Sequence, residues 1–247
     1  MRSLEDVLAL TEGVDGWLSE AQARRLHDAA ARCRDGGRIV EIGSFRGRST
    51  IVLAASAPDG VEVVAIDPHA GNDRGPGEID GYVAEAATDR DVFRANLARA
   101  GVADRVRHVA ALSSAAHADV SDPIDVLFVD GAHRYAPARA DIHEWGARVR
   151  NGGTLLIHDS FSSVGVTLAI MRELMFGRRF RYAGRARSLT IYHADLDGGG
   201  RSRALNALRQ MAQLPWFAKN LMLKVLLTLK LGTLLRRLGR AEPEWPY

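Results

Sequence analysis

The sequence predicts an α/β fold, in which a largely parallel sheet is covered by helices on both faces. Short apolar strands alternate with helical segments over residues 19–176, an order that implies right-handed crossovers and therefore a parallel sheet. The strand segments lack the polar alternation of a sheet with one face in water. A chain of 247 residues is long enough for one large domain of this kind.

The predicted elements follow one another with recognisable boundaries. A first helix at 19–33 begins at Ser19, with Gln22 in capping-box spacing, and a later helix at 91–101 ends at Gly101. Between them lies a long loop at 68–87, rich in glycine, proline and aspartate. The apolar periodicity predicts further helices at 49–57, 135–150 and 164–176. Strands are predicted at 38–43, 61–67, 106–111, 124–130 and 153–160, followed by a closing hairpin at 181–194.

Four of the predicted strands end in an acidic residue: Glu41, Asp67, Asp130 and Asp159. The carboxyl ends of parallel strands meet at one edge of the sheet, and ligands of open α/β sheets bind there. Burying a carboxylate is costly unless it is paired, hydrogen-bonded or bound to a cation. We therefore expect the four acids to line one rim and to mark a functional site.

The segment EIGSFRGRST places Gly43 and Gly47 between the first strand and a helix. Glycine lets the backbone approach a ligand closely, and the free N–H groups from about Ser49 onward suit a carboxylate. Asp67 follows 24 residues after Gly43, where an acid can accept two ribose hydroxyls. The spacing differs from the dinucleotide fingerprint. Together these residues predict a nucleoside-containing cofactor.

The composition restricts the class of protein. Hydrophobic residues make up 47% and charged residues 26% of the chain, as in an ordinary globular protein. Cys33 is the only cysteine, so the chain has neither a disulfide framework nor a cysteine zinc site. The sequence contains no apolar run of eighteen residues and its N-terminus does not look like a secretory signal. These features favour a cytoplasmic enzyme.

The positive charge of the chain is concentrated at its C-terminal end. Residues 201–247 hold nine Lys or Arg against two Glu, a net charge of +7, so the overall charge gives no reason to expect a nucleic-acid partner. We predict a basic amphipathic helical tail at 201–247. Its apolar segment at 214–240 has two explanations: peripheral contact with an anionic membrane surface, or packing on the domain or a second copy in a homodimer. The second is favoured here.

Several segments taken together resemble the class I S-adenosylmethionine-dependent methyltransferases: VEIGSFRGRST, VVAIDPHAG, DRVRHVAALSS, PIDVLFVDGAHRYAPARADIHEW and VRNGGTLLIHDSF. The resemblance implies a Rossmann-like sheet of seven strands whose last strand is antiparallel. It also implies that Glu41 and Gly43 lie near the methionine part of the cofactor, Asp67 at the ribose, and Ala111 and Leu112 near the adenine. No acid near residue 111 is available for the adenine amine, so we expect that contact from the backbone or from Ser113.

The resemblance covers roughly residues 30–195 and so implies a domain organisation. An N-terminal helical segment at 1–37 precedes a cofactor-binding methyltransferase domain at 38–195, and the tail at 201–247 follows. Within the domain, residues 68–90 are a candidate lid, because long loops over a rim often close over a site.

The stretch from DGAHRY to HDS most resembles the metal-dependent bacterial sugar O-methyltransferases of the macrocin and mycinamicin type. That resemblance implies that Asp130 and Asp159 hold a divalent metal and that His133 is the general base. Asp130 therefore belongs both to the cofactor pocket and to the metal site. The residue beside Asp159 is His158 where those enzymes have an acid, and it is either a third ligand or a hydrogen-bond donor to the ligands.

The chemistry of methyl transfer explains why such residues are needed. A sulfonium donor is already activated, whereas a hydroxyl is a poor nucleophile until its proton leaves. A bound cation can polarise that hydroxyl, and a neutral histidine can accept its proton. Two carboxylates suit Mg²⁺, while a histidine ligand would favour Mn²⁺ or Co²⁺.

The acceptor is expected to be a small molecule or an oligosaccharide. The resemblance favours a sugar hydroxyl, in a glycosylated metabolite or a mannose-type unit of a methylated polysaccharide. The alternatives are a phenol or catechol acceptor, and a non-catalytic cofactor-binding adaptor for a membrane or partner. His69, Tyr82 and Tyr135 are the candidate acceptor-binding residues.

Overall fold

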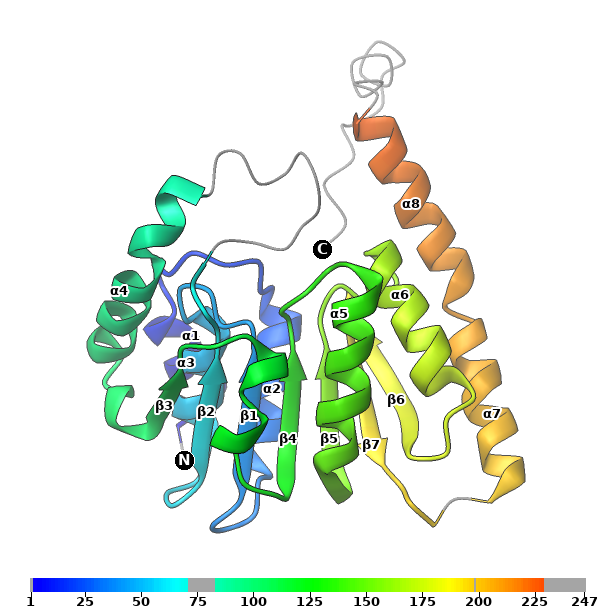
Figure 1. Ribbon diagram of the computed structural model, residues 1–247, viewed down its shortest axis with the longest axis horizontal. Coiled ribbons are helices and arrows are strands. Elements are labelled where there is room, and N and C mark those ends of the chain that lie inside the picture. The colour runs from blue at the N-terminus through cyan, green and yellow to red at the C-terminus, as the bar shows by residue number, and fades with distance from the viewer. Residues whose placement is uncertain (1, 71–82, 198, 229–247) are drawn as a thin grey trace.

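The computed structural model describes residues 2–70, 83–197 and 199–228. Its centre is a sheet of seven strands in the order β3-β2-β1-β4-β5-β7-β6 (Figure 1). Strand β7 runs antiparallel to both its neighbours, β5 and β6, and the other pairs are parallel. The strands are β1 Arg38–Ile42, β2 Glu62–Ile66, β3 Val106–Val109, β4 Ile124–Val129, β5 Val149–Ile157, β6 Phe180–Ala186 and β7 Leu189–Ala194. The predicted sheet is confirmed.

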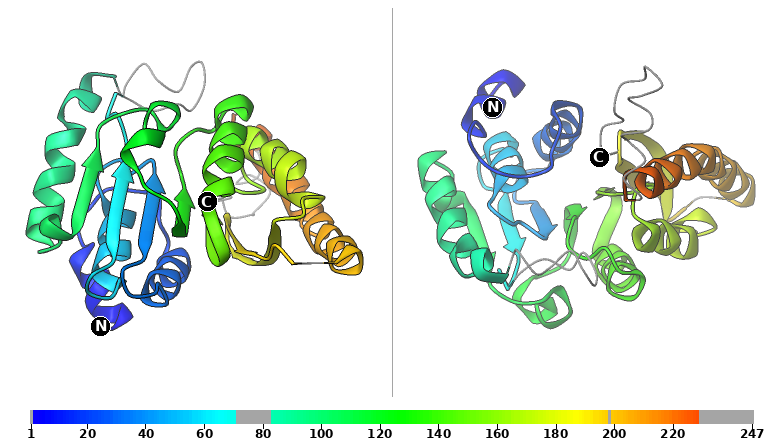
Figure 2. Two further views of the ribbon diagram at one scale, coloured as in Figure 1. Left: turned by 60° about the horizontal axis from the view of Figure 1, so that its bottom comes forward. Right: turned by 90° about the horizontal axis from the view of Figure 1, so that it is seen from above.

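Helices cover both faces of this sheet (Figure 2). One apolar cluster joins the sheet to the first four helices, and a second joins it to α5, α6 and the start of α8. Each face therefore buries the apolar side chains that the continuous strand pattern predicts. The helices are α1 Leu4–Leu10, α2 Glu20–Ala31, α3 Arg48–Ser56, α4 Val83–Arg99, α5 Tyr135–Ala140, α6 Val164–Ile170, α7 Gly200–Met211 and α8 Leu214–Thr228. No helix in the described part of the chain has the length and apolarity to cross a bilayer.

The predicted bounds of strand β5 and of helix α4 were wrong. Strand β5 begins at Val149 and ends at Ile157, so the predicted end at residue 160 lies in a turn. The helix expected at 91–101 already begins at Val83, which shortens the predicted loop at 68–87. Residues 71–82 of that loop, and most of the candidate lid, lie outside the described residues.

The helix expected at 135–150 is regular only to Ala140. It continues as a π-helical turn, η4, over Asp141–Trp145 and a short 3₁₀ turn, η5, over Gly146–Arg148. Single π-helical turns in otherwise regular helices often occur at functional sites.

Strand register brings the ends of four strands together. Ile42 of β1 pairs with Ile66 of β2 and with Val129 of β4, and Val129 pairs with Ile157 of β5. The residues that follow, Gly43, Asp67, Asp130 and His158, therefore lie side by side at the carboxyl edge of the sheet. We refer to this edge as the rim.

Candidate active site

Glu41 lies inside the sheet rather than on the rim, which corrects the expectation that four acids line one edge. It is fully buried in β1, one residue before the strand ends. Its carboxyl group accepts hydrogen bonds from the hydroxyl groups of Ser49 and Thr50 in the first turn of α3. Burial raises the pKa of Glu41 to about 8, and the nearby carboxylates of Asp130 and Asp67 act in the same direction. Glu41 therefore holds α3 against β1 from below the rim.

The loop after β1 passes very close to the loop after β4. Gly43 has φ +85°, and a side chain there would place Cβ 2.4 Å from the carbonyl oxygen of Asp130. Only glycine adopts that conformation readily and leaves room for the neighbouring backbone. A glycine is therefore required at position 43 because the two loops pack so closely there.

Asp67 organises the same loop. One carboxylate oxygen accepts the backbone N–H groups of Ser44 and Phe45, each at 2.9 Å, and the other accepts that of His69 at 2.7 Å. The His69 ring adds a second tie, with Nε2 lying 2.8 Å from the carbonyl oxygen of Phe45. Oδ2 thus uses both of its lone pairs on the loop, whereas Oδ1 keeps one lone pair for a further donor in the cavity that Asp67 lines.

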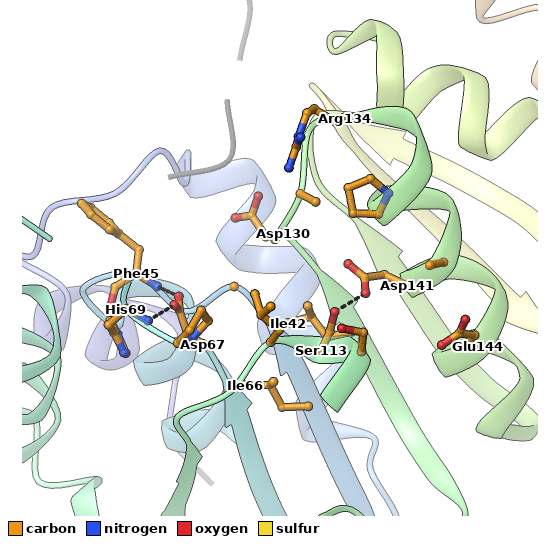
Figure 3. Close-up of a pocket in the computed structure, with 18 of the residues that line it drawn as sticks. Ile42, Phe45, Ile66, Asp67, His69, Ser113, Asp130, Arg134, Asp141 and Glu144 are labelled. Atoms are coloured by element: carbon orange, nitrogen blue, oxygen red, sulfur yellow. Dashed lines mark hydrogen bonds between the residues drawn. The ribbon is translucent and has the colours of Figure 1, made fainter. Parts of the chain in front are cut away.

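A cavity of about 340 Å³ runs along the rim, a size typical of small-molecule sites. It begins between Asp67 and His69, passes Asp130, and extends to Ser113 and Asp141 (Figure 3). Its walls also include the apolar side chains that close the strand ends, together with Phe45, Leu112 and Arg134.

Asp141 forms the far end of the cavity and was not predicted. It begins η4, is 4% exposed, and accepts a hydrogen bond from the Ser113 hydroxyl at 2.5 Å. Burial raises the pKa of Asp141 to about 6, with Glu144 contributing in the same direction. An acid therefore does face the segment at 111–113, but it comes from a different element. The spacing of the third-strand segment could not reveal it, because η4 follows β4.

A second group of polar side chains lies beside the cavity. Ligand atoms of Asp130, His133 and Asp159 all lie within 4.8 Å of one another, close enough to share a metal ion. Nε2 of His133 is 2.5 Å from a carboxylate oxygen of Asp159. The other ring nitrogen, Nδ1, is buried and has no hydrogen-bond partner among the described residues. Two carboxylates with an imidazole are a donor set that fits a divalent cation.

The charge of Asp159 is stabilised although its side chain is largely buried. Burial opposes ionisation, but the imidazoles of His158 and His133 outweigh it and hold the pKa of Asp159 well below its usual range. The backbone of Asp159 has φ +52°, an uncommon conformation for a residue other than glycine, which aspartate tolerates better than most. This turn aims the carboxylate back toward His133.

His158 is placed as a hydrogen-bond donor to Asp130. Its Nδ1 is 3.1 Å from a carboxylate oxygen of Asp130 and 3.7 Å from one of Asp159, and its side chain is buried. Burial disfavours the charged ring, yet the two carboxylates raise the pKa of His158 well above its usual value. A nitrogen that carries a proton cannot also bind a metal. The group that the fold brings together is therefore Asp130, His133 and Asp159, without His158.

Gln22 orients that histidine, a role that its predicted part in a capping box did not reveal. The Gln22 side-chain oxygen accepts the backbone N–H of Ser19 at 2.8 Å, which leaves its amide nitrogen as the donor. That nitrogen lies 3.1 Å from the Ser188 hydroxyl and 3.2 Å from Nε2 of His158. Gln22 therefore holds the ring with Nδ1 turned toward Asp130.

The other predicted site residues fall into two groups. Gly43, Asp67, His69, Leu112, Ser113 and Asp130 line the cavity. Gly47, Ser49, Ala111 and Tyr135 do not line it. Gly47 caps α3 with φ +90°, and Tyr135 is exposed at the start of α5. Tyr82 lies outside the described residues.

A glycine loop, an acid after β2 and a cavity at the rim define a nucleoside-binding α/β domain. Its seven strands and antiparallel last strand are those implied by the resemblance to the class I methyltransferases. Residues 40–160 match the family model of a methyltransferase domain. This part of the chain is a methyltransferase domain, and its fold is the one expected of the class I S-adenosylmethionine-dependent enzymes.

Solved structures share this fold at low sequence identity. Cofactor-bound Rv0187 from MTB is 23% identical, with a TM-score of 0.52 over 79% of this chain and 90% of that one. An O-methyltransferase from Bacillus cereus, solved with SAH, is 21% identical, with a TM-score of 0.51 over 78% and 91%. The O-methyltransferase NovP is 18% identical, with a TM-score of 0.58 over 72% and 81%.

Proposed function

We propose that this protein is an O-methyltransferase that moves a methyl group from S-adenosylmethionine to a sugar hydroxyl with the help of a divalent metal. The observation that carries the proposal is the group of Asp130, His133 and Asp159 beside the cofactor cavity. O-methyltransferases among the structures with the same fold support the choice of oxygen as acceptor atom.

The cofactor would lie along the cavity. Oδ1 of Asp67 would accept a ribose hydroxyl through the lone pair that its bond from the His69 N–H leaves. The adenine would lie between Leu112 and the pair formed by Ser113 and Asp141. There an ionised Asp141 would accept a hydrogen bond from the exocyclic amine. The methionine end then points to Gly43 and Asp130, next to the proposed metal ligands.

The transfer itself needs one bond to form and one to break. The hydroxyl oxygen attacks the methyl carbon, the carbon–sulfur bond breaks, and its electrons neutralise the sulfonium. The products are a methyl ether and S-adenosylhomocysteine. Nε2–H of His133 donates to Asp159 at 2.5 Å, and the other ring nitrogen, Nδ1, accepts the hydroxyl proton.

Asp130 and Asp159 would hold the metal, Mg²⁺ or alternatively Mn²⁺ or Co²⁺. A cation held there would supply Lewis-acid polarisation of the acceptor hydroxyl. His158 positions Asp130 from behind by donating its Nδ1–H. Holding the reacting atoms in line can lower a barrier by about 7–11 kcal/mol, so positioning is expected to matter more than the base.

A methyl-transfer screen tests the proposal. Transfer of a labelled methyl group is measured on panels of sugars and of phenols, with Mg²⁺, Mn²⁺ or Co²⁺ and with EDTA. We expect sugar methylation that EDTA abolishes. Activity that EDTA leaves unchanged would refute the metal, methylation of phenols alone would refute the sugar, and cofactor binding without any transfer would favour an adaptor.

Variants separate the two roles open to His133. His133→Ala is expected to lower turnover by about 10²–10⁴-fold while cofactor and metal affinity stay unchanged. Asp159→Asn is expected to weaken metal binding as measured by calorimetry. Asp122→Asn, which changes an exposed carboxylate at the opposite end of β4, is the matched control. Loss of metal binding in His133→Ala would make this residue a ligand instead of the base.

A further inference from the structure

Helices α7 and α8 expose a row of large apolar side chains. Leu208 is 62% and Met222 is 56% exposed. The complete set in these helices is Leu205, Leu208, Met211, Leu221, Met222 and Val225. Apolar side chains grouped in this way mark an interaction surface, whereas single exposed ones are ordinary.

The opposite faces of both helices are fixed to the domain. In α7, Asn206 and Gln210 are buried, and their amide groups donate to the carbonyl oxygen of Leu174. In α8, buried Asn220 donates to the carbonyl oxygen of Phe161 at 3.0 Å. The exposed row is therefore the outer face of helices that are already docked.

The charged side chains of α7 and α8 are all basic. Residues 200–228 contain five Lys or Arg and no acid. With 3.6 residues per turn, Leu221, Met222 and Val225 share one stripe of α8, and Lys219 and Lys224 lie on either side of it. An apolar stripe flanked by basic residues is typical of helices that lie in an anionic membrane surface, where lysine heads reach the phosphates.

We propose that the outer face of α7 and α8 binds an anionic membrane surface. A second copy of the chain is a poorer match. A two-fold contact would bring this patch onto itself, and with no acid in residues 200–228 the like charges would repel. Anionic lipid headgroups supply the missing negative charge.

The placement of α8 ties the membrane contact to the site. Figure 1 shows α8 rising past the carboxyl ends of the strands, which form the edge of the sheet where the cavity lies. The bond from Asn220 to Phe161 fixes α8 to the turn that follows Asp159. The rim would thus be held at the membrane. On the proposed function, the acceptor hydroxyl then belongs to a membrane-anchored molecule such as a lipid-linked sugar.

Vesicle flotation of the full chain tests the surface without requiring any catalysis. The probes are vesicles of phosphatidylcholine alone and vesicles with about 30% phosphatidylglycerol, at low and high salt. We expect binding to the anionic vesicles only, weakened by salt. The double variant Leu221→Glu and Met222→Glu is expected to lower the bound fraction by tenfold or more. Methyl transfer to a water-soluble acceptor should be unchanged in this variant.

The double variant Phe176→Glu and Leu196→Glu is the matched control. It makes the same chemical change at exposed apolar side chains outside α7 and α8, and it should bind like the unmodified chain. If the first variant does not fold, Arg209→Gln with Lys219→Gln tests the charge alone. Equal binding by all variants would refute the proposal. A dimer in sedimentation velocity that Leu221→Glu and Met222→Glu dissociates would show a second copy to be the partner.

Discussion

Replacing Glu41 by glutamine is expected to make the folded protein less sensitive to pH between about pH 6 and pH 8. Glutamine has the same shape, and the hydroxyls of Ser49 and Thr50 can each donate or accept, so the contacts at α3 are retained. What the substitution removes is a buried group that can ionise. The effect should therefore appear as a change in pH dependence.

The magnitude follows from the pKa of Glu41. Its value of about 8 in the folded chain lies above the ordinary 4.5, so the folded state binds the proton more tightly than the unfolded state does. The resulting stability is complete below the ordinary pKa and is lost as the pH rises through the folded one. Linkage gives a loss of about 2 kcal/mol between about pH 6 and pH 8, relative to the glutamine variant.

Urea unfolding of both proteins at a series of pH values measures this difference. All other ionisable groups are shared, so their contributions cancel in the comparison. Glu20→Gln, at an exposed carboxylate in the first turn of α2, is the control and should show a constant difference from the unmodified chain. Parallel pH profiles for Glu41→Gln and the unmodified chain would refute the raised pKa.

Three further substitutions have expected outcomes. Gly43→Ala should lower stability by about 1–3 kcal/mol and weaken cofactor binding, because its Cβ would meet the Asp130 carbonyl; an unchanged melting temperature contradicts this. Asp141→Asn should raise the KM for S-adenosylmethionine about tenfold with little change in kcat, as one lost hydrogen bond to a charged group implies; equal KM values would place the adenine elsewhere. Gly165→Ala would put Cβ 2.2 Å from the carbonyl oxygen of His133, so kcat should fall while cofactor affinity is retained, and an unchanged kcat would count against the proposed base.

The rim was predictable because parallel strands place the residues that follow them at one edge of the sheet. Once β1, β2 and β4 are recognised, the residues after them must meet at one edge, which is how Asp67 and Asp130 were predicted as neighbours. Glu41 lies two residues before Gly43, the residue that is level with Asp67 and Asp130. Whether an acid follows a strand or lies within it decides whether it faces a cavity or the core, and strand boundaries are the least certain part of a pattern.

Asp141 and Gln22 could not be predicted for a different reason. Each reaches the site from a helix whose own pattern explains the residue: Gln22 completes a cap, and Asp141 sits in a helical turn. Their contacts with His158 and Ser113 join segments 136 and 28 residues apart. Such contacts depend on how helices cross the sheet, which periodicity within one helix does not encode.

The acids around the cavity also bear on what leaves it. Asp67, Asp130, Asp141 and Glu144 line the cavity from one end to the other, and this arrangement attracts a cation. A sulfonium cofactor is positively charged when it enters and its thioether product is not. The acids that attract the donor therefore attract the spent cofactor less strongly. The loss of the positive charge at the sulfur atom favours release of the product.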